Sequence, residues 1–335
     1  MLLSPLFAFF SFGFSINWSM IENALHKLRN RHFCVIGDVI LDIFSYGGVT
    51  RMSPEAPVPV LDVKKQNEVP GGALNVCNNL RSLDASVEII GVLGDDYEAF
   101  RLEYLCEKAG IKKTGLLRDL RRVTTSKTRF FDGAKALLRS DMEQRDPLPP
   151  HLEDKMLQEV RRALKTSDAC IVQDYNKGVL TPRLIPEILR LAADADVPVF
   201  VDPKFDHVFS YGGAFLIKPN RTETERMSAK RIAAYEDAEA LSTELREKLR
   251  CENLLITLGH EGMLLQTPEA RHYYPARKLQ TADITGAGDT VIAVLAALYS
   301  AGLPLERAAE FANRAAAAVC ALPGVVCVRP EMLAE

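Results

Sequence analysis

Residues 283–289 read Asp-Ile-Thr-Gly-Ala-Gly-Asp, and residues 290–298 continue as Thr-Val-Ile-Ala-Val-Leu-Ala-Ala-Leu. The second segment is apolar and free of Gly and Pro, which predicts a buried helix. Gly286 and Gly288 permit positive φ and close backbone approach, so the first segment predicts a tight turn that opens this helix. Backbone N–H groups and the positive end of the helix dipole then point at one spot, which favours phosphate or another anion.

Asp289 stands at this anion site although its carboxylate repels an anion. A carboxylate is needed there if it is the general base for a hydroxyl that attacks a bound phosphoryl group. The backbone amides of Gly286, Ala287 and Gly288 then hold the charge that develops on that group. The alternative interpretation of the same residues is a glycine loop with an Asp at the start of a helix.

The string Asp-x-Thr-Gly-Ala-Gly-Asp near the C-terminal end resembles the second signature of the ribokinase-like (PfkB) sugar kinases. This resemblance implies that residues 286–288 form the anion hole for the transferring phosphate and that Asp289 is the catalytic base. It also implies a fold, which is a three-layer α/β/α sandwich with a mostly parallel sheet and a small β-lid.

The composition is that of an ordinary globular protein, with 335 residues, 47% of them hydrophobic and 25% charged. The net charge is −3, so no basic excess indicates a nucleic acid or a membrane as partner. The 7 cysteines lack CxxC spacing and several lie in apolar runs, which predicts reduced, buried thiols and a cytoplasmic location. The 6 histidines form no pair with metal-ligand spacing.

Residues 1–19 are apolar and aromatic and contain no Lys or Arg. A signal peptide has a positively charged start, and Pro5, Gly13 and several polar residues interrupt this segment as a membrane-spanning helix. We therefore expect residues 1–19 to be a disordered extension, with a membrane anchor as the alternative. Residues 20–335 are expected to form a single kinase domain.

Between the extension and the C-terminus, short β-rich runs alternate with helical segments. We expect strands near 33–37, 87–93, 169–174, 197–202, 214–217 and 253–257, and helices near 73–80, 97–109, 151–165, 182–195 and 304–322. This alternation predicts a doubly wound parallel sheet.

The segment 51–63 departs from the alternation, because its prolines exclude a helix or a central strand. Together with a hairpin around Asp132-Gly133, it predicts a β-lid built from about 44–63 and 127–139. Residues 51–60 read Arg-Met-Ser-Pro-Glu-Ala-Pro-Val-Pro-Val, which resembles the heptose 7-phosphate kinases of the family. In such kinases the lid covers the sugar and often forms the dimer contact, so the resemblance implies a homodimer.

On the sugar side, Gly71 and Gly72 precede a predicted helix with Asn75 in its first turn. This segment resembles the first PfkB signature, which implies that these three residues bind sugar hydroxyls. Asp42, shortly after the first predicted strand, lies where the family has an acid on the sugar. Asp174, at the tip of the buried strand 169–174, completes this set.

A sugar phosphate needs cations beside the sugar site, and the candidates are Arg51, Arg129, Arg139 and Lys177. Lys177 is favoured, because it follows a buried strand at the carboxyl edge of the sheet and Gly178 lets the backbone bend there. The alternative interpretation of each cation is a solvated surface charge.

The nucleotide is expected at the opposite end of the site. Asn220, Arg221, Thr222 and Glu223 resemble the family segment for nucleotide phosphates and magnesium, with Glu223 reaching Mg²⁺ through water. Lys218, just before them, stands where many relatives have a neutral residue. Thr257, Gly259 and Gly262 resemble the family residues at the edge of the nucleotide site. Asn313 lies where relatives border the adenine pocket.

These features predict ATP-dependent, Mg²⁺-assisted phosphorylation of D-glycero-β-D-manno-heptose 7-phosphate at O1, as in ADP-heptose and lipopolysaccharide core synthesis. The family resemblance alone implies this substrate and pathway. The alternatives are a PfkB-type kinase for another sugar or nucleoside, and a non-catalytic sugar-binding regulator on the same fold. The resemblance covers residues 33 to about 328, so we expect a kinase-only form without the nucleotidyltransferase half of some relatives.

Overall fold

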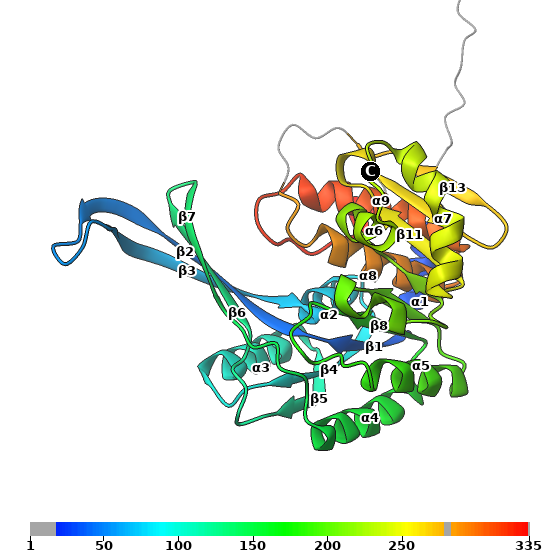
Figure 1. The fold of residues 1–335 in the computed structure, drawn as a ribbon, viewed down its shortest axis with the longest axis horizontal. Coiled ribbons are helices and arrows are strands. Elements are labelled where there is room, and N and C mark those ends of the chain that lie inside the picture. The colour runs from blue at the N-terminus through cyan, green and yellow to red at the C-terminus, as the bar shows by residue number, and fades with distance from the viewer. Residues whose placement is uncertain (1–17, 278–282, 334–335) are drawn as a thin grey trace, which may run out of the picture.

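A nine-stranded sheet forms the centre of the molecule in the computed structural model, which describes residues 18–277 and 283–333 (Figure 1). The strand order is β13-β12-β11-β10-β9-β8-β1-β4-β5. All neighbours from β11 to β5 pair in parallel, whereas β12 and β13 are antiparallel. The strands are β1 (His32–Gly37), β4 (Ser86–Leu93), β5 (Lys112–Arg118), β8 (Ala169–Gln173), β9 (Val199–Asp202), β10 (Leu216–Ile217), β11 (Asn253–Thr257), β12 (Met263–Gln266) and β13 (Arg271–Tyr274).

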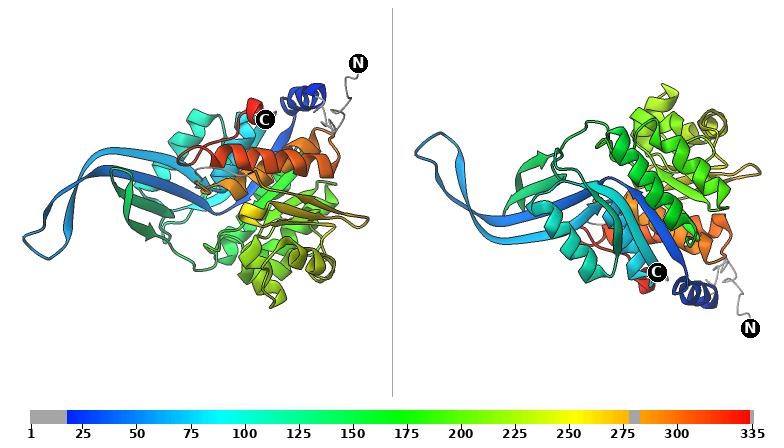
Figure 2. Two further views of the ribbon diagram at one scale, coloured as in Figure 1. Left: turned by 90° about the horizontal axis from the view of Figure 1, so that it is seen from above. Right: turned by 90° about the horizontal axis from the view of Figure 1, so that it is seen from below.

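Helices cover both faces of this sheet and bury two separate hydrophobic clusters against it (Figures 1 and 2). One face carries α1 (Trp18–Leu28), α2 (Ala73–Ser82), α3 (Tyr97–Ala109), α8 (Ala287–Ser300) and α9 (Leu305–Cys320). The other carries α4 (Pro150–Leu164), α5 (Leu184–Asp194), α6 (Arg221–Ser228) and α7 (Tyr235–Leu249). Short 3-10 helices are η1 (Phe205–Ser210), η2 (Gly259–Glu261) and η3 (Pro330–Leu333). The predicted three-layer α/β/α architecture is therefore confirmed.

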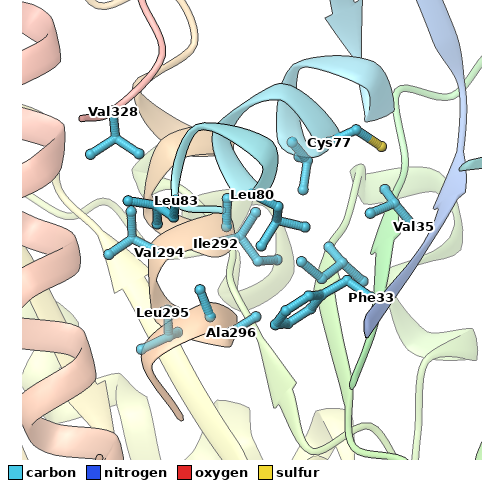
Figure 3. Close-up of a cluster of buried hydrophobic side chains, with 14 of the residues drawn as sticks. Phe33, Val35, Cys77, Leu80, Leu83, Ile292, Val294, Leu295, Ala296 and Val328 are labelled. Carbon is cyan, nitrogen blue, oxygen red and sulfur yellow. The ribbon is translucent and has the colours of Figure 1, made fainter. Parts of the chain in front are cut away.

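Helix α8 lies at the centre of one cluster, and its apolar sequence explains this position. Residues 290–298 of the helix are all buried, as expected for a helix that is apolar on every side. Figure 3 shows Ile292 and Val294 of α8 beside Leu80 and Leu83 at the end of α2, with Phe33 of β1 nearby. This packing holds α8 against α2 and the central strands.

The lid is a separate four-stranded sheet in the order β3-β2-β6-β7. It consists of β2 (Val39–Met52), β3 (Pro59–Gly72), β6 (Ser126–Asp132) and β7 (Lys135–Met142), so it is longer than the segments 44–63 and 127–139. Pro59 and Pro70 lie on the edge strand β3, where a missing N–H is tolerated, and Pro54 and Pro57 lie in the connection between β2 and β3. Figure 1 shows β2 and β3 extending far beyond the body of the molecule.

The sequence did not predict α1, α6, α7, β5, β12 or β13. Helix α1 begins at Trp18, so the last two residues of the predicted disordered extension are helical. Residues 1–17 of that extension lie outside the described part of the chain. All 7 cysteines are free thiols, and only Cys327 is not buried. Within the described ranges, no helix has the length and apolar character needed to cross a membrane.

Candidate active site

The N-terminus of α8 forms the turn that the sequence predicted. Gly286 precedes the helix with φ 81°, a left-handed conformation that favours glycine. Asp283 fixes the turn, because its carboxylate accepts hydrogen bonds from the backbone N–H groups of Thr285 (3.0 Å) and Gly324 (2.9 Å). The Ala287 N–H donates to the Ile284 carbonyl at 3.2 Å. One of the three predicted anion-binding amides is thus engaged within the turn itself.

Asp289 lies in the first turn of α8, is 4% exposed and accepts three side-chain hydrogen bonds. Asn75 donates to its Oδ2 at 2.7 Å. Gln173 and Tyr175 both donate to its Oδ1 at 2.9 Å. These donors come from α2, from the end of β8 and from the loop after β8. The two sequence signatures therefore meet at one carboxylate.

Burial raises the pKa of Asp289 to about 6, and the charge of Asp202 adds to this shift. The hydrogen bonds from Asn75 and Tyr175 and the charge of Lys218 oppose it. A carboxylate with this pKa is ionised near neutral pH and is more basic than an ordinary aspartate, as suits a general base.

Lys218 places a buried cation beside the glycine turn. Its ammonium group lies 3.1 Å from Asp202 Oδ2. A Cβ atom on Gly288 would lie 3.3 Å from the same nitrogen, so a larger residue would press on it. Gln173 bridges the pair to the base, since its Nε2 donates to both Asp202 and Asp289 at 2.9 Å.

Sequence reasoning missed Gln173, Tyr175, Asp202 and Lys218 as site residues. The available signal was their place, since each lies at or just after the carboxyl end of β8, β9 or β10. Ligand sites of open α/β sheets form at that edge.

On the sugar side, the structure brings Asp42, Gly71 and Arg129 together. Asp42 is 7% exposed and its Oδ1 accepts a hydrogen bond from Arg129 of β6 at 2.5 Å. A Cβ on Gly71 would lie 2.0 Å from the other oxygen of Asp42, so a larger residue would displace that carboxylate. Gly72, the residue before α2, has φ 58°, and the Ala73 N–H donates to the Asp38 carbonyl at 2.9 Å.

A pocket of about 320 Å³ opens beside this centre. Its lining includes three residues of the predicted nucleotide segment, Asn220, Thr222 and Glu223, together with Tyr175 and Lys177. Three further cations, Arg145, Lys204 and Arg226, also line it. Such a cationic pocket suits a polyphosphate.

Lys177 was expected beside the sugar and away from the nucleotide segment, but the structure places it next to that segment. Lys177 shares the pocket with Asn220 and Thr222, and its ammonium group lies 2.6 Å from Glu143 Oε2. Despite partial burial, the bonds from Lys177 and Arg145 lower the pKa of Glu143 to about 2. Lys177 thus faces a carboxylate between the lid and α4.

Asp174, also predicted to bind the sugar, is 1% exposed, and both its oxygens have protein donors. The Asn176 N–H donates to one oxygen at 2.7 Å, and the Tyr211 hydroxyl donates to the other at 2.9 Å. Burial raises the pKa of Asp174. These contacts give Asp174 a role in holding the loop after β8.

Asn220 and Glu223 form a reciprocal capping box at the start of α6. The Glu223 N–H donates to Asn220 Oδ1 at 2.9 Å, and the Asn220 N–H donates to Glu223 Oε2 at 2.8 Å. The other oxygen of Glu223 lies 2.7 Å from the ammonium group of Lys204. The Asn-x-x-Glu spacing therefore has a local structural cause as well as a place in the pocket.

A magnesium site can be tested against these side chains. In the described residues no group of three or more His, Cys, Asp or Glu side chains could hold a metal ion. Mg²⁺ usually keeps several waters and binds one or two carboxylates plus substrate phosphates. Both oxygens of Glu223 already have protein partners, so this residue fits a contact through water.

The remaining predicted nucleotide residues gather at the β11–β13 end of the sheet. Gly262 has φ 101°, and a Cβ there would lie 2.0 Å from the Tyr274 carbonyl. Asn313 of α9 donates to the next carbonyl, that of Pro275, at 2.9 Å. Thr257 pairs with Asn220 in an isolated bridge, and Gly259, with φ 65°, follows it.

Three cations that were expected to bind the nucleotide or the sugar phosphate do not line the pocket. Arg221 pairs with Glu261 and donates to the Leu258 carbonyl at 3.1 Å, which ties α6 to the loop after β11. Arg51 is exposed nine residues beyond Asp42 on β2, which corresponds to about 30 Å along the strand. Arg139 is exposed on β7 and lies 2.9 Å from Asp141.

Comparisons with known proteins agree with this geometry. Residues 30–331 match the family model for pfkB family carbohydrate kinases. The bifunctional protein HldE of Acidiphilium cryptum is 36% identical over 312 residues, which are 93% of this chain and 64% of that protein. HldE of Gluconobacter oxydans is 39% identical over 316 residues, with 93% and 65% covered. The chain thus spans slightly less than two thirds of the length of these relatives.

Solved structures share the fold at low sequence identity. Escherichia coli phosphofructokinase-2 in its tetrameric inhibited form has a TM-score of 0.76 at 15% identity, covering 91% of this chain and 97% of that chain. Arabidopsis thaliana ribokinase complexed with ribose and ATP has a TM-score of 0.70 at 16% identity, with the same coverage. The ribokinase-like fold and the prediction of a phosphotransferase of the carbohydrate kinase class are confirmed. The chain belongs to the pfkB family of carbohydrate kinases.

Proposed function

We propose that the chain transfers the γ-phosphoryl group of ATP to O1 of D-glycero-β-D-manno-heptose 7-phosphate. The observation that carries this proposal is the position of Asp289. Its buried carboxylate lies at a helix N-terminus, accepts a hydrogen bond from Asn75 of the sugar signature, and has Lys218 beside the adjoining glycine turn. A base, a sugar-side donor and an anion site therefore converge at one point.

In the proposed reaction, Asp289 accepts the proton of the O1 hydroxyl as the oxygen attacks the γ-phosphorus. The new O–P bond forms while the bond from that phosphorus to the β–γ bridging oxygen breaks, and ADP leaves. The glycine turn and Lys218 stabilise the charge on the transferring group. Positioning and electrostatics supply most of the rate in such a transfer.

The sugar is proposed to bind between the lid and α2. Asp42, Gly71, Gly72 and Asn75 would face its hydroxyls, and Arg129 adds a cation beside Asp42. Arg129 is now a stronger candidate for the sugar phosphate than Lys177, because Lys177 lies in the pocket with Asn220 and Thr222.

ATP is proposed to place its phosphates in the cationic pocket and its base near the β11–β13 end. Asn220, Thr222 and Lys177 line the pocket that would receive the phosphates. Glu223 would contact Mg²⁺ through water, and the metal would neutralise charge on the phosphates when bound. Gly262 and Asn313, which both approach the segment 274–275, would border the base.

The choice of a heptose phosphate rests on the lid sequence 51–60 and on the HldE relatives. We place the reaction in ADP-heptose and lipopolysaccharide core synthesis, in the cytoplasm, and carried out by a homodimer.

The test is ATP consumption by the purified protein with Mg²⁺, measured over a panel of sugars. The panel contains heptose 7-phosphate, ribose, fructose, fructose 6-phosphate and adenosine, each at the same concentrations. The proposal predicts the highest kcat/KM with heptose 7-phosphate. A preference for an unphosphorylated sugar or for a nucleoside would contradict it.

A further inference from the structure

Tyr175 joins the two halves of the site, although it lies outside the sequence motifs described above. Its hydroxyl donates to Asp289 Oδ1 at 2.9 Å. Its ring lines the cationic pocket, and the Lys204 ammonium group lies 5.4 Å from the ring centroid. One side chain thus contacts the proposed base and the proposed phosphate pocket.

The hydrogen bonds on Asp289 are distributed unequally between its two oxygens. A carboxylate has about four lone-pair sites, two on each oxygen. Gln173 and Tyr175 both donate to Oδ1, whereas Asn75 is the one donor to Oδ2 among the residues that the structure describes. The fourth site, on Oδ2, is therefore the one left for the proton of a sugar hydroxyl.

Asp38 fixes the loop that carries Tyr175. It is 1% exposed at the end of β1, and its Oδ2 accepts the backbone N–H groups of Tyr175 at 2.8 Å and Lys177 at 3.1 Å. Its other oxygen has no hydrogen-bond partner in the described part of the chain. Burying such a carboxylate is unfavourable, and the two backbone hydrogen bonds to Oδ2 offset part of this cost while they fix the loop.

We propose that Tyr175 is a positioning residue for Asp289. The Tyr175 hydroxyl holds Oδ1 of Asp289 so that Oδ2 faces the sugar hydroxyl. Asp38 acts through Tyr175, because it fixes the loop that carries Tyr175. This inference rests on the proposed function, because it assumes that Asp289 is the base. It adds the reacting oxygen and two residues that the family signatures do not contain.

Other charged groups also face Asp289, and their charges stay the same when Tyr175 is substituted. Asp202 extends from β9, Lys204 from the turn after it, and Lys218 from the segment after β10. Helix α2 contributes the neutral side chain of Asn75, and β8 contributes the neutral side chain of Gln173. A substitution at Tyr175 alters the hydrogen bond without altering any of these charges.

The first experiment compares Tyr175→Phe with Tyr211→Phe. Both tyrosines donate to a buried aspartate at 2.9 Å, but Tyr211 donates to Asp174. Loss of a hydrogen bond to a charged group should raise the pKa of Asp289 by about one to two units. In Y175F the acid limb of kcat/KM should therefore move to higher pH, with KM for the sugar phosphate little changed. In Y211F the Asn176 N–H still donates to Asp174 and holds the loop, so the limb should stay in place.

A second readout does not need activity. Carboxyl ¹³C titration by NMR, with the Asp289 signal assigned by its loss in Asp289→Asn, should show the same upward shift in Y175F only. Equal titration of Asp289 in wild type and Y175F would overturn the inference. A wild-type protein without kinase activity would overturn the proposed function. The NMR titration would still show whether the Tyr175 hydroxyl lowers the pKa of Asp289.

Asp38 is tested by Asp38→Ala, Asp38→Asn and the double variant D38A/Y175F. D38A should shift the titration of Asp289 as Y175F does, and D38N, which keeps an acceptor oxygen, should restore most of the wild-type behaviour. The double variant should shift no further than Y175F alone, because the two residues act in series. Additive shifts would show that Asp38 does not act through Tyr175. D38A also serves as the test if Y175F does not fold.

Discussion

Asp289 is held in a state that costs the folded protein stability. Burial favours the protonated form, so the pKa of Asp289 in the folded protein is about 6 against an ordinary value of 3.8. Between these pH values the folded state binds the proton more tightly than the unfolded state. Stability therefore falls as pH rises through this window, and the loss is complete above pH 6. Active sites often retain such a cost because the chemistry needs the group.

Asp289→Asn removes this titration, which gives a stability prediction. Between pH 4.5 and 7.5, the free energy of unfolding of the variant should rise relative to that of wild type by on the order of 2 kcal/mol. Urea unfolding at several pH values measures this difference.

Asp283→Asn is the matched control for that experiment. Despite partial burial, hydrogen bonds from Thr285 and Gly324 hold the pKa of Asp283 below its ordinary value of 3.8. The stability that Asp283 contributes is therefore lost only below about pH 4. The free energy of unfolding of D283N relative to that of wild type should therefore stay constant from pH 5 to 7.5. A level difference for D289N would contradict the assignment of the raised pKa.

Arg129 and Arg139 allow a matched test of the sugar side. They are opposite each other on β6 and β7, but only Arg129 pairs with Asp42. A charge-assisted bond to a phosphate contributes about 1.5–3 kcal/mol, so Arg129→Ala should raise KM for the sugar phosphate roughly ten- to a hundredfold. KM for ATP should change little, and R139A should change neither value. Steady-state kinetics with each substrate varied in turn measures both, and equal effects of R129A and R139A would remove Arg129 from the sugar site.

At the scale of elements, the sequence predicted the architecture better than the side-chain network. The glycine turn, α8, the helix after Gly72 and the hairpin at Gly133 carry local signals, and the structure confirms them. Contacts such as Gln173 to Asp289 join residues 116 positions apart. No local pattern encodes such a pair, because it depends on how neighbouring parallel strands align.

Local signals also had more than one cause. The Asn220–Glu223 spacing indicated a nucleotide segment, but the same spacing forms a capping box. Lys177 was assigned to the sugar from its place after β8, yet the chain turns there toward α6 and the pocket. The sequence could predict that the site lies at the carboxyl edge of the sheet. It could not predict whether a given cation at this edge faces the sugar or the nucleotide pocket.

Helix α1 gives a prediction about the N-terminus. A protein that starts at Met20 keeps Ile21, Ala24 and Leu28, which are buried in the cluster that contains α8. It should be stable and active, because residues 1–19 carry no motif. A protein that starts at Arg31 loses those side chains, and each large one contributes about 1.5–3 kcal/mol. Thermal unfolding and kinase assays of both proteins test this, and a Met20 protein that aggregates would contradict it.

At the scale of the whole molecule, the exposed surface of the lid supports the prediction of a homodimer. Its exposed apolar residues include Val58, Val63 and Leu138, which are 51%, 51% and 63% exposed. Edge strands and apolar faces of this kind favour a partner. Light scattering at micromolar concentration should give a dimer, and Val63→Glu with Leu138→Glu should give a monomer. Leu120→Glu, at an exposed site outside the lid strands, should remain a dimer. A monomeric wild-type protein would contradict the prediction.

We propose that Asp289 is the base of a kinase for a phosphorylated heptose. This role is tested by the kcat of wild type and Asp289→Asn for the conversion of heptose 7-phosphate to the 1,7-bisphosphate at pH 7.5. Loss of a general base typically lowers turnover by about 10²–10⁴-fold, so we expect a loss of that size in a variant that remains folded. A folded D289N protein with near wild-type kcat would contradict it.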